Sequence, residues 1–146
     1  MSFRFEHRWL LDASREAAYD VLVDLERYPE WWPQISAVVK LGEDHGLVLC
    51  RSLLPFTLHL ELRPEVREPE NGVLQVSIEG DLEGWSRFTL TPTPAGLDVH
   101  YEQEVETRRV LLAATRFVRR VVRANHTWMM RGCRTGLAGR VGALSA

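Results

Sequence analysis

Two hydrophobic periods divide this sequence, and the point where one replaces the other constrains the fold more than any other feature. Between Phe3 and Leu11 apolar side chains alternate with polar ones, which is the pattern of a half-buried strand. Further extended segments follow at residues 35–41, 47–52, 57–67, 73–79, 82–91 and 97–107. From about Val110 to Leu137 apolar side chains recur every three or four residues, which is typical of an amphipathic helix. This order predicts an α+β fold with an antiparallel sheet.

The segment after the first strand predicts two short helices. Ser14 can cap a helix whose apolar stripe includes Ala17 and Leu22. That helix is expected to end near Arg27, because Pro29 disfavours helical geometry at the residue before it. A short turn or helix with two adjacent tryptophans between two prolines comes next.

We expect residues 1–146 to form a single domain, in which a curved seven-stranded antiparallel sheet surrounds the C-terminal helix. Gly132 and Gly136 are expected to weaken the last turns of that helix, because glycine has a low helix propensity. A sheet of this size curls, and one helix cannot cover its whole concave face. The sequence therefore predicts a pocket between sheet and helix, unless large side chains fill it.

The net charge of −2 conceals a strong division along the chain. Residues 1–107 carry a charge of −11, whereas residues 108–146 carry nine arginines, no acidic residue and a charge of +9. Four of these arginines share one helical face: Arg116, Arg119, Arg120 and Arg123. This face is either simply solvated or a contact surface for the periphery of an anionic membrane or for an acidic protein. Nucleic acid ranks last, because no aromatic side chains for base stacking are interleaved with the arginines.

Several classes of protein are excluded by what the sequence lacks. No run of 18 apolar residues could span a membrane, and the charged N-terminal segment does not resemble a signal peptide, so we expect a cytoplasmic protein. Cys50 and Cys133 do not form a CxxC motif. The sequence contains no GxSxG, P-loop, GxGxxG or HExxH motif, and we expect no cofactor.

Two histidine–carboxylate pairs raise the question of a metal site. His59 with Glu61, and His100 with Glu102, each share one face of a predicted strand. Two other strands are expected to separate them, which places the pairs about 14 Å apart. Metal–ligand bonds of about 2 Å cannot bridge that distance, so no metal is expected.

Three segments resemble the START-like superfamily, also called SRPBCC or helix-grip proteins, and in particular its polyketide cyclase-like and coenzyme Q-binding members. Asp24–Pro33 resembles the turn that follows their first helix, and residues 84–90 with 96–101 resemble their penultimate hairpin. Residues 125–132 resemble the C-terminal helix of bacterial members. The resemblance covers essentially the whole chain. It implies the helix-grip fold and a ligand such as a lipid, hormone, quinone or polyketide intermediate, and only some members are enzymes.

One position departs from the pattern of many of these relatives. They carry a tryptophan two residues before the phenylalanine that corresponds to Phe88, whereas this sequence has Ser86 there. The neighbouring Trp85 is expected to point to the other face of the strand. The pocket should therefore lack one large ring.

We expect ligand-binding side chains on the inner faces of the first and last strands and of the C-terminal helix. His7 could be a polar anchor there or a core histidine bonded to backbone, and a buried Asn125 needs a partner from the protein, from water or from the ligand. Trp32 is the tryptophan of its pair expected to contact a ligand. The full set of candidates is His7, Trp9, Trp32, Phe88, Tyr101, Gln103, Asn125, Trp128 and Met129.

Three functions remain open at this point. The first is binding or transport of a hydrophobic small molecule such as a lipid, an isoprenoid quinone or a polyketide-like compound, by a monomer or homodimer. The second is a polyketide aromatase/cyclase, in which His7 or Tyr101 would move protons. The third is an interaction module that acts through the arginine-rich helix.

Overall fold

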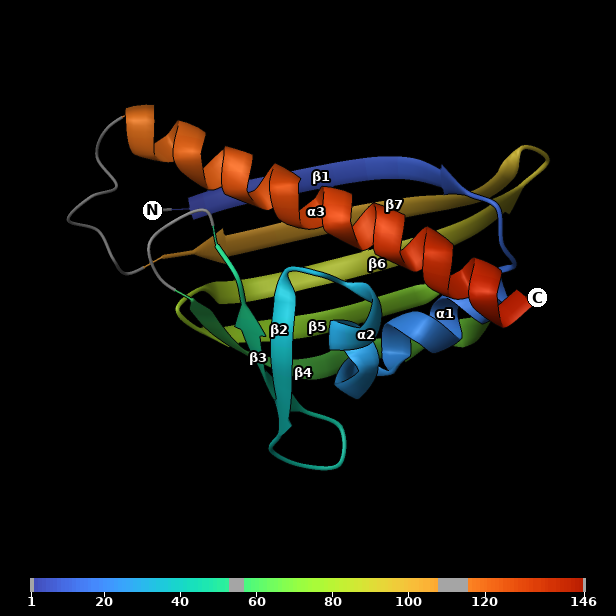
Figure 1. Cartoon of the computed structure of the whole chain (residues 1–146), viewed down its shortest axis with the longest axis horizontal. Coiled ribbons are helices and arrows are strands. Elements are labelled where there is room, and N and C mark those ends of the chain that lie inside the picture. The colour runs from blue at the N-terminus through green and yellow to red at the C-terminus, as the bar shows by residue number, and fades with distance from the viewer. Residues whose placement is uncertain (1, 53–56, 108–115, 146) are drawn as a thin grey trace.

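In the computed structural model, residues 2–52, 57–107 and 116–145 are described, with the backbone alone for 116–118 and 143–145. Seven antiparallel strands form one sheet in the order β1-β7-β6-β5-β4-β3-β2. The strands are β1 (Ser2–Leu11), β2 (Ile35–Lys40), β3 (Gly46–Cys50), β4 (Leu58–Glu68), β5 (Val73–Gly80), β6 (Glu83–Thr93) and β7 (Gly96–Glu106). Figure 1 shows β2 and β3 running steeply across the direction of β6 and β7, so the sheet is strongly curled.

The helices lie where the change of period and the turn residues predict them. They are α1 (Arg15–Val23), η1 (Leu25–Arg27), α2 (Tyr28–Trp31), η2 (Pro69–Asn71) and α3 (Arg116–Ser145). The Ser14 side chain caps α1 by accepting a hydrogen bond of 3.1 Å from the backbone N–H of Ala17. The predicted α+β helix-grip architecture is confirmed: one long C-terminal helix lies against the concave side of a seven-stranded sheet.

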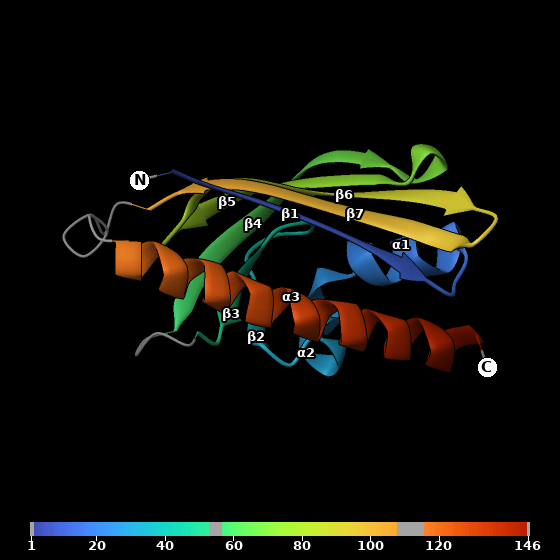
Figure 2. The ribbon, with the colours of Figure 1, turned by 90° about the horizontal axis from the view of Figure 1, so that it is seen from above.

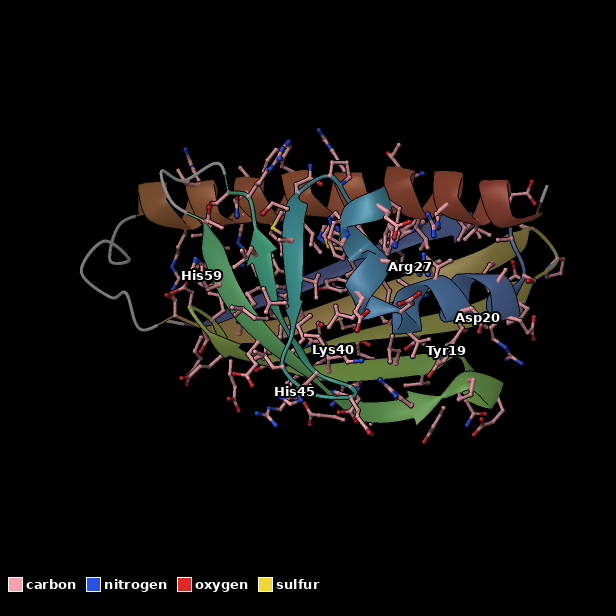
Figure 3. The ribbon with its side chains drawn as sticks, turned by 60° about the horizontal axis from the view of Figure 1, so that its bottom comes forward. Tyr19, Asp20, Arg27, Lys40, His45 and His59 are labelled. Atoms are coloured by element: carbon pink, nitrogen blue, oxygen red, sulfur yellow. The ribbon has the colours of Figure 1, made fainter. Side chains whose placement is uncertain are left out.

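The short helices close one end of the fold. Figure 2 shows α3 crossing the sheet, with α1 and α2 beside its C-terminal half. In that half Cys133, Leu137 and Val141 are fully buried, and they form part of a continuous core with side chains of α1 and α2. At the other side of the short helices, Lys40 of β2 makes an ion pair of 3.3 Å with Glu26 of η1 (Figure 3). The two halves of α3 therefore have different surroundings.

The C-terminal helix is longer than the sequence pattern predicts. It continues past Leu137 to Ser145, so the expected weakening at Gly132 and Gly136 is wrong; its predicted first residues lie outside the described part of the chain. A Cβ atom at Gly136 would overlap the backbone oxygen of Trp31, and one at Gly132 would overlap the side-chain amide of Gln34. The two glycines therefore let α3 approach the α2 region closely, and the packing gained there stabilises the helix that glycine alone would weaken.

We predict that Gly136→Ala destabilises the protein by about 2 kcal/mol, because the added methyl group must displace the backbone at Trp31. Gly139→Ala is the matched control on the same helix, since nothing lies within 4 Å of a Cβ at Gly139. This control should gain up to about 1 kcal/mol from its better helix propensity. Urea unfolding of the two variants measures both effects, and equal stabilities would contradict the close approach.

Candidate ligand-binding site

A cavity of about 180 Å³ lies between the sheet and the part of α3 that precedes the packed half. Its wall is mainly apolar and comes from every strand of the sheet, from α3 and from the segment of the short helices. Val122, Asn125, His126, Met129 and Met130 are the side chains of α3 that line it. The predicted pocket is therefore present, because α3 is anchored at its C-terminal half and large side chains do not fill the space beside its other half.

Six of the nine predicted site residues line this cavity: Trp32, Phe88, Tyr101, Gln103, Asn125 and Met129. His7, Trp9 and Trp128 are not part of its wall. Trp9 is buried opposite Val99, at the closed end of the sheet, and Trp128 is half-buried outside the wall. His7 contacts a side chain of the wall but does not itself line the cavity. That any of these residues contacts a ligand stays a prediction.

The register of β6 places Ser86 and Trp85 on the two faces of the sheet that the sequence predicts for them. Ser86 lines the cavity, and Trp85 lies on the opposite face of the sheet. There Trp85 has the guanidinium carbon of Arg87 at 5.0 Å from its ring centre and that of Arg4 at 5.9 Å. A small hydroxyl-bearing side chain thus occupies the place in the wall where many relatives of this fold carry an indole.

Four polar side chains from three elements form a connected network at the cavity. Tyr101 and Gln103 come from β7, His126 from α3 and His7 from β1. The Tyr101 hydroxyl donates to Gln103 Oε1, and His126 Nε2 lies 3.0 Å from the same oxygen. His126 Nδ1 lies 3.2 Å from His7 Nε2. The network joins the half-buried ring of His7 to the cavity wall.

The place of the Gln103 oxygen assigns a tautomer to each of the two histidines. An amide oxygen can only accept hydrogen bonds, so His126 must carry its hydrogen on Nε2. Its Nδ1 is then an acceptor, and His7 donates to it through Nε2–H. The ring of Phe5 stacks on His126 with centroids 3.7 Å apart and an angle of 10° between the planes. The imidazole of His126 is thereby held in both position and orientation.

Burial keeps the wall of the cavity electrically neutral. It lowers the pKa of His126 to about 3, and the neighbouring charges of His7 and Arg123 lower it further in the same direction. Burial also lowers the pKa of His7, raises the pKa of the Tyr101 hydroxyl well above its usual range, and raises the pKa of the Cys50 thiol to about 12. At neutral pH these groups are an uncharged imidazole pair, a phenol and a thiol.

His126 is the network residue that the sequence analysis did not select. It lies three residues before Met129 and seven before Cys133, so the helical period already placed it on the inner face. From this stretch the sequence pattern selected Asn125, Trp128 and Met129, but not His126. In the structure both Asn125 and His126 are buried and line the cavity.

The arginine face of α3 lies beside the same wall. Arg119, Arg120 and Arg123 are exposed, and the side chain of Arg116 lies outside the described residues. The guanidinium carbon of Arg119 lies 5.8 Å from the ring centre of Phe3, and that of Arg123 lies 5.9 Å from the ring centre of Phe5. Two of the predicted docking arginines thus also cover rings that line the cavity.

The histidine–carboxylate pairs remain apart, since β5 and β6 lie between β4 and β7. His59, near the start of β4, is exposed (Figure 3), and His100 Nε2 lies 2.9 Å from Glu6 Oε1 of β1. Among the described residues no three His, Cys, Asp or Glu side chains form a group that could hold a metal ion. In the same part of the chain, no helix is long and apolar enough to cross a membrane.

We predict that His126 makes the folded state less stable as the solution becomes acidic. Below the ordinary pKa of 6.5 the unfolded chain takes up a proton on this residue, whereas the folded chain does so only near 3, so stability falls across that window. Between pH 7 and pH 5 the loss due to His126 amounts to about 2 kcal/mol. Urea unfolding of the wild type and of His126→Gln at the two pH values should show this difference. The control His59→Gln, at an exposed position, should behave like the wild type.

Comparisons with known proteins agree with this architecture. A family model for polyketide cyclase/dehydrase and lipid transport proteins matches residues 2–135. The aromatase/cyclase Zhui from Streptomyces sp. R1128 is 14% identical with a TM-score of 0.80, over 100% of this chain and 97% of that chain. A protein from Thermus thermophilus is 17% identical with a TM-score of 0.83, over 100% of both chains.

A START superfamily protein from Mycobacterium smegmatis is 16% identical with a TM-score of 0.76, over 97% of this chain and 98% of that chain. At such identities the structural likeness shows a shared fold. A comparison with proteins of curated function finds no match. The resemblance to polyketide cyclase-like proteins is confirmed, since the family match covers nearly the whole length: the chain belongs to the polyketide cyclase/dehydrase and lipid transport family.

Proposed function

We propose that this protein binds and carries one hydrophobic small molecule in the cavity between the sheet and α3. The observation that carries the proposal is an apolar cavity of about 180 Å³ between the sheet and α3. An apolar cavity of about 150 Å³ is enough to hold one benzene-sized ring. Affinity would come from removing apolar surface from water, at about 25 cal/mol per Å². Lipids, isoprenoid quinones and polyketide-like ring compounds are the ligand types we consider.

The side chains around the cavity favour binding over proton transfer. A polyketide aromatase/cyclase needs a group that gives or takes a proton during the reaction. Of the titratable groups in the wall, Tyr101 and His126 both donate to Gln103 Oε1, and an amide oxygen passes no proton between its donors. His7, the other proton-moving candidate, is separated from the cavity by His126. We therefore place carriage of a ligand before catalysis.

We predict that Ser86→Trp weakens binding of an apolar probe at least tenfold, because an indole at this place would occupy the cavity. Thr91→Trp is the matched control, an exposed position on the same strand and on the opposite face. Titration with the neutral fluorophore N-phenylnaphthylamine measures both variants. Native mass spectrometry after incubation with a cellular lipid extract provides a second measurement on the wild type. A wild-type protein that takes up neither the fluorophore nor any lipid would contradict the proposal.

We further propose that the arginine face of α3 places the protein on an anionic lipid bilayer, where an apolar ligand is collected. Arg119, Arg120, Arg123, Arg131 and Arg134 have no acidic partner within ion-pair distance among the described residues. On the sheet, by contrast, Arg4, Arg8, Arg63 and Arg87 are all ion-paired. Each arginine near an anionic membrane surface contributes about 1 kcal/mol to binding.

We predict that reversing Arg116, Arg119, Arg120 and Arg123 to glutamate abolishes co-sedimentation with vesicles of phosphatidylcholine and phosphatidylglycerol. The wild type should sediment with these vesicles, should not sediment with pure phosphatidylcholine, and should be released by salt. The control reverses two exposed sheet arginines in the double variant R8E/R63E and should sediment like the wild type. Sedimentation of the quadruple variant at the wild-type level would refute the docking surface.

A further inference from the structure

The side-chain amide of Gln103 has its oxygen turned towards two neighbouring side chains. The residue is only 6% exposed and lines the cavity. Two donors, the Tyr101 hydroxyl and His126 Nε2–H, converge on its oxygen. The oxygen therefore faces Tyr101 and His126, and the NH2 group must face elsewhere.

No described residue accepts a hydrogen bond from Gln103 Nε2. The wall around this group is largely apolar, with Phe88 and Val105 among its members. A buried donor that makes no hydrogen bond costs the full desolvation of that donor. A ligand that displaces water from the Gln103 amide must replace the lost hydrogen bond or bind more weakly.

The charges around the cavity restrict the ligand further. His126 is neutral at physiological pH, because burial lowers its pKa to about 3. The charged side chains among the described residues of the wall are Asp44 and Arg67, and both are exposed. A carboxylate or ammonium group placed at Gln103 would be buried beside a neutral amide and a neutral imidazole, while Arg123 is exposed over the ring of Phe5, so its burial would be unfavourable.

We infer that the cavity selects a neutral ring compound with a carbonyl or ether oxygen that accepts a hydrogen bond from Gln103 Nε2–H. This inference rests on the proposed binding function and adds the chemical class of the ligand to it. The apolar body of the ligand occupies the cavity, and its oxygen meets the amide. Tyr101 and His126 act as positioning residues, because they hold the amide with its donors towards the ligand.

The test compares indanone with indane, two probes of the same ring size that differ by one carbonyl group, in competition with N-phenylnaphthylamine. Indane is the more hydrophobic probe, so the informative quantity is the ratio of the two affinities and how a variant changes it. In Gln103→Met, which keeps the length of the side chain but lacks the amide, the ratio of indanone to indane affinity should fall about tenfold. The control Gln75→Met makes the same substitution on the outer face of β5, away from the cavity wall, and should leave the ratio unchanged. Indane carboxylate should bind far more weakly than indanone to the wild type.

The outcomes separate this inference from the function on which it rests. If the wild type binds neither probe nor the fluorophore, the binding function itself is refuted. If it binds both probes and Gln103→Met leaves the ratio unchanged, the acceptor site is refuted while the binding function stands. A change of ratio in Gln75→Met as large as that in Gln103→Met would show that the effect does not come from a contact in the cavity, and it would also overturn the inference.

A measurement on the wild type covers the case in which Gln103→Met does not fold, since that variant removes the acceptor shared by Tyr101 and His126. The side-chain NH2 resonances of Gln103 in a ¹⁵N–¹H NMR spectrum should shift downfield with indanone, as expected for a new hydrogen bond. Indane should produce no such shift. Equal responses to the two probes would overturn the inference.

Discussion

The close approach of α3 to the α2 region is the constraint on which the rest of the structure depends. At Gly132 and Gly136 there is no room for a side chain between the helix and residues 31 and 34. This contact anchors the C-terminal half of α3 in the core, where Cys133 and Leu137 are completely buried. A long helix is stiff, so the direction of its other half follows from this anchor. The cavity exists because that direction leaves space beside the curled sheet.

A single oxygen atom organises the polar part of the cavity. Gln103 Oε1 takes hydrogen bonds from a phenol on its own strand and from an imidazole on α3, and so links sheet and helix across the apolar interior. Each of these groups would be costly to bury alone, whereas together they satisfy one another at the oxygen. In the same arrangement, the nitrogen of the Gln103 amide donates no hydrogen bond to a described residue. Under the proposed ligand selection, stability and selection would depend on opposite ends of one side chain.

Much of this fold could be predicted from the sequence, because hydrophobic period and turn residues act locally. Alternation identified the strands and placed Phe88, Tyr101 and Gln103 on the inner face, where they line the cavity. Alternation does not reveal how far along a strand the packed core extends. Trp9 shares the inner face but lies at the packed end, and for that reason it does not reach the cavity.

The remaining differences arise from contacts between distant parts of the chain. The length of α3 could not be judged from Gly132 and Gly136 alone, because the contacts that stabilise the helix there come from residues about a hundred positions earlier. The role of His126 depends on His7 and Gln103, which lie on two different strands. The helical spacing indicates which face of α3 carries His126, but it does not indicate which residues form hydrogen bonds with it.

The separation of charge between the sheet and α3 makes the molecule a strong electric dipole. Residues 1–107 carry −11 and residues 108–146 carry +9, and the helix α3 lies on one side of the sheet (Figure 2). Because the net charge is −2, an anionic surface repels the protein weakly at a distance and attracts only the face of α3 on close approach. Such a molecule would rotate until α3 faces the surface before it binds. Its binding would then be weak. Weak, oriented attachment of this kind would suit the proposed carrier function, in which the protein must leave the surface as readily as it arrives.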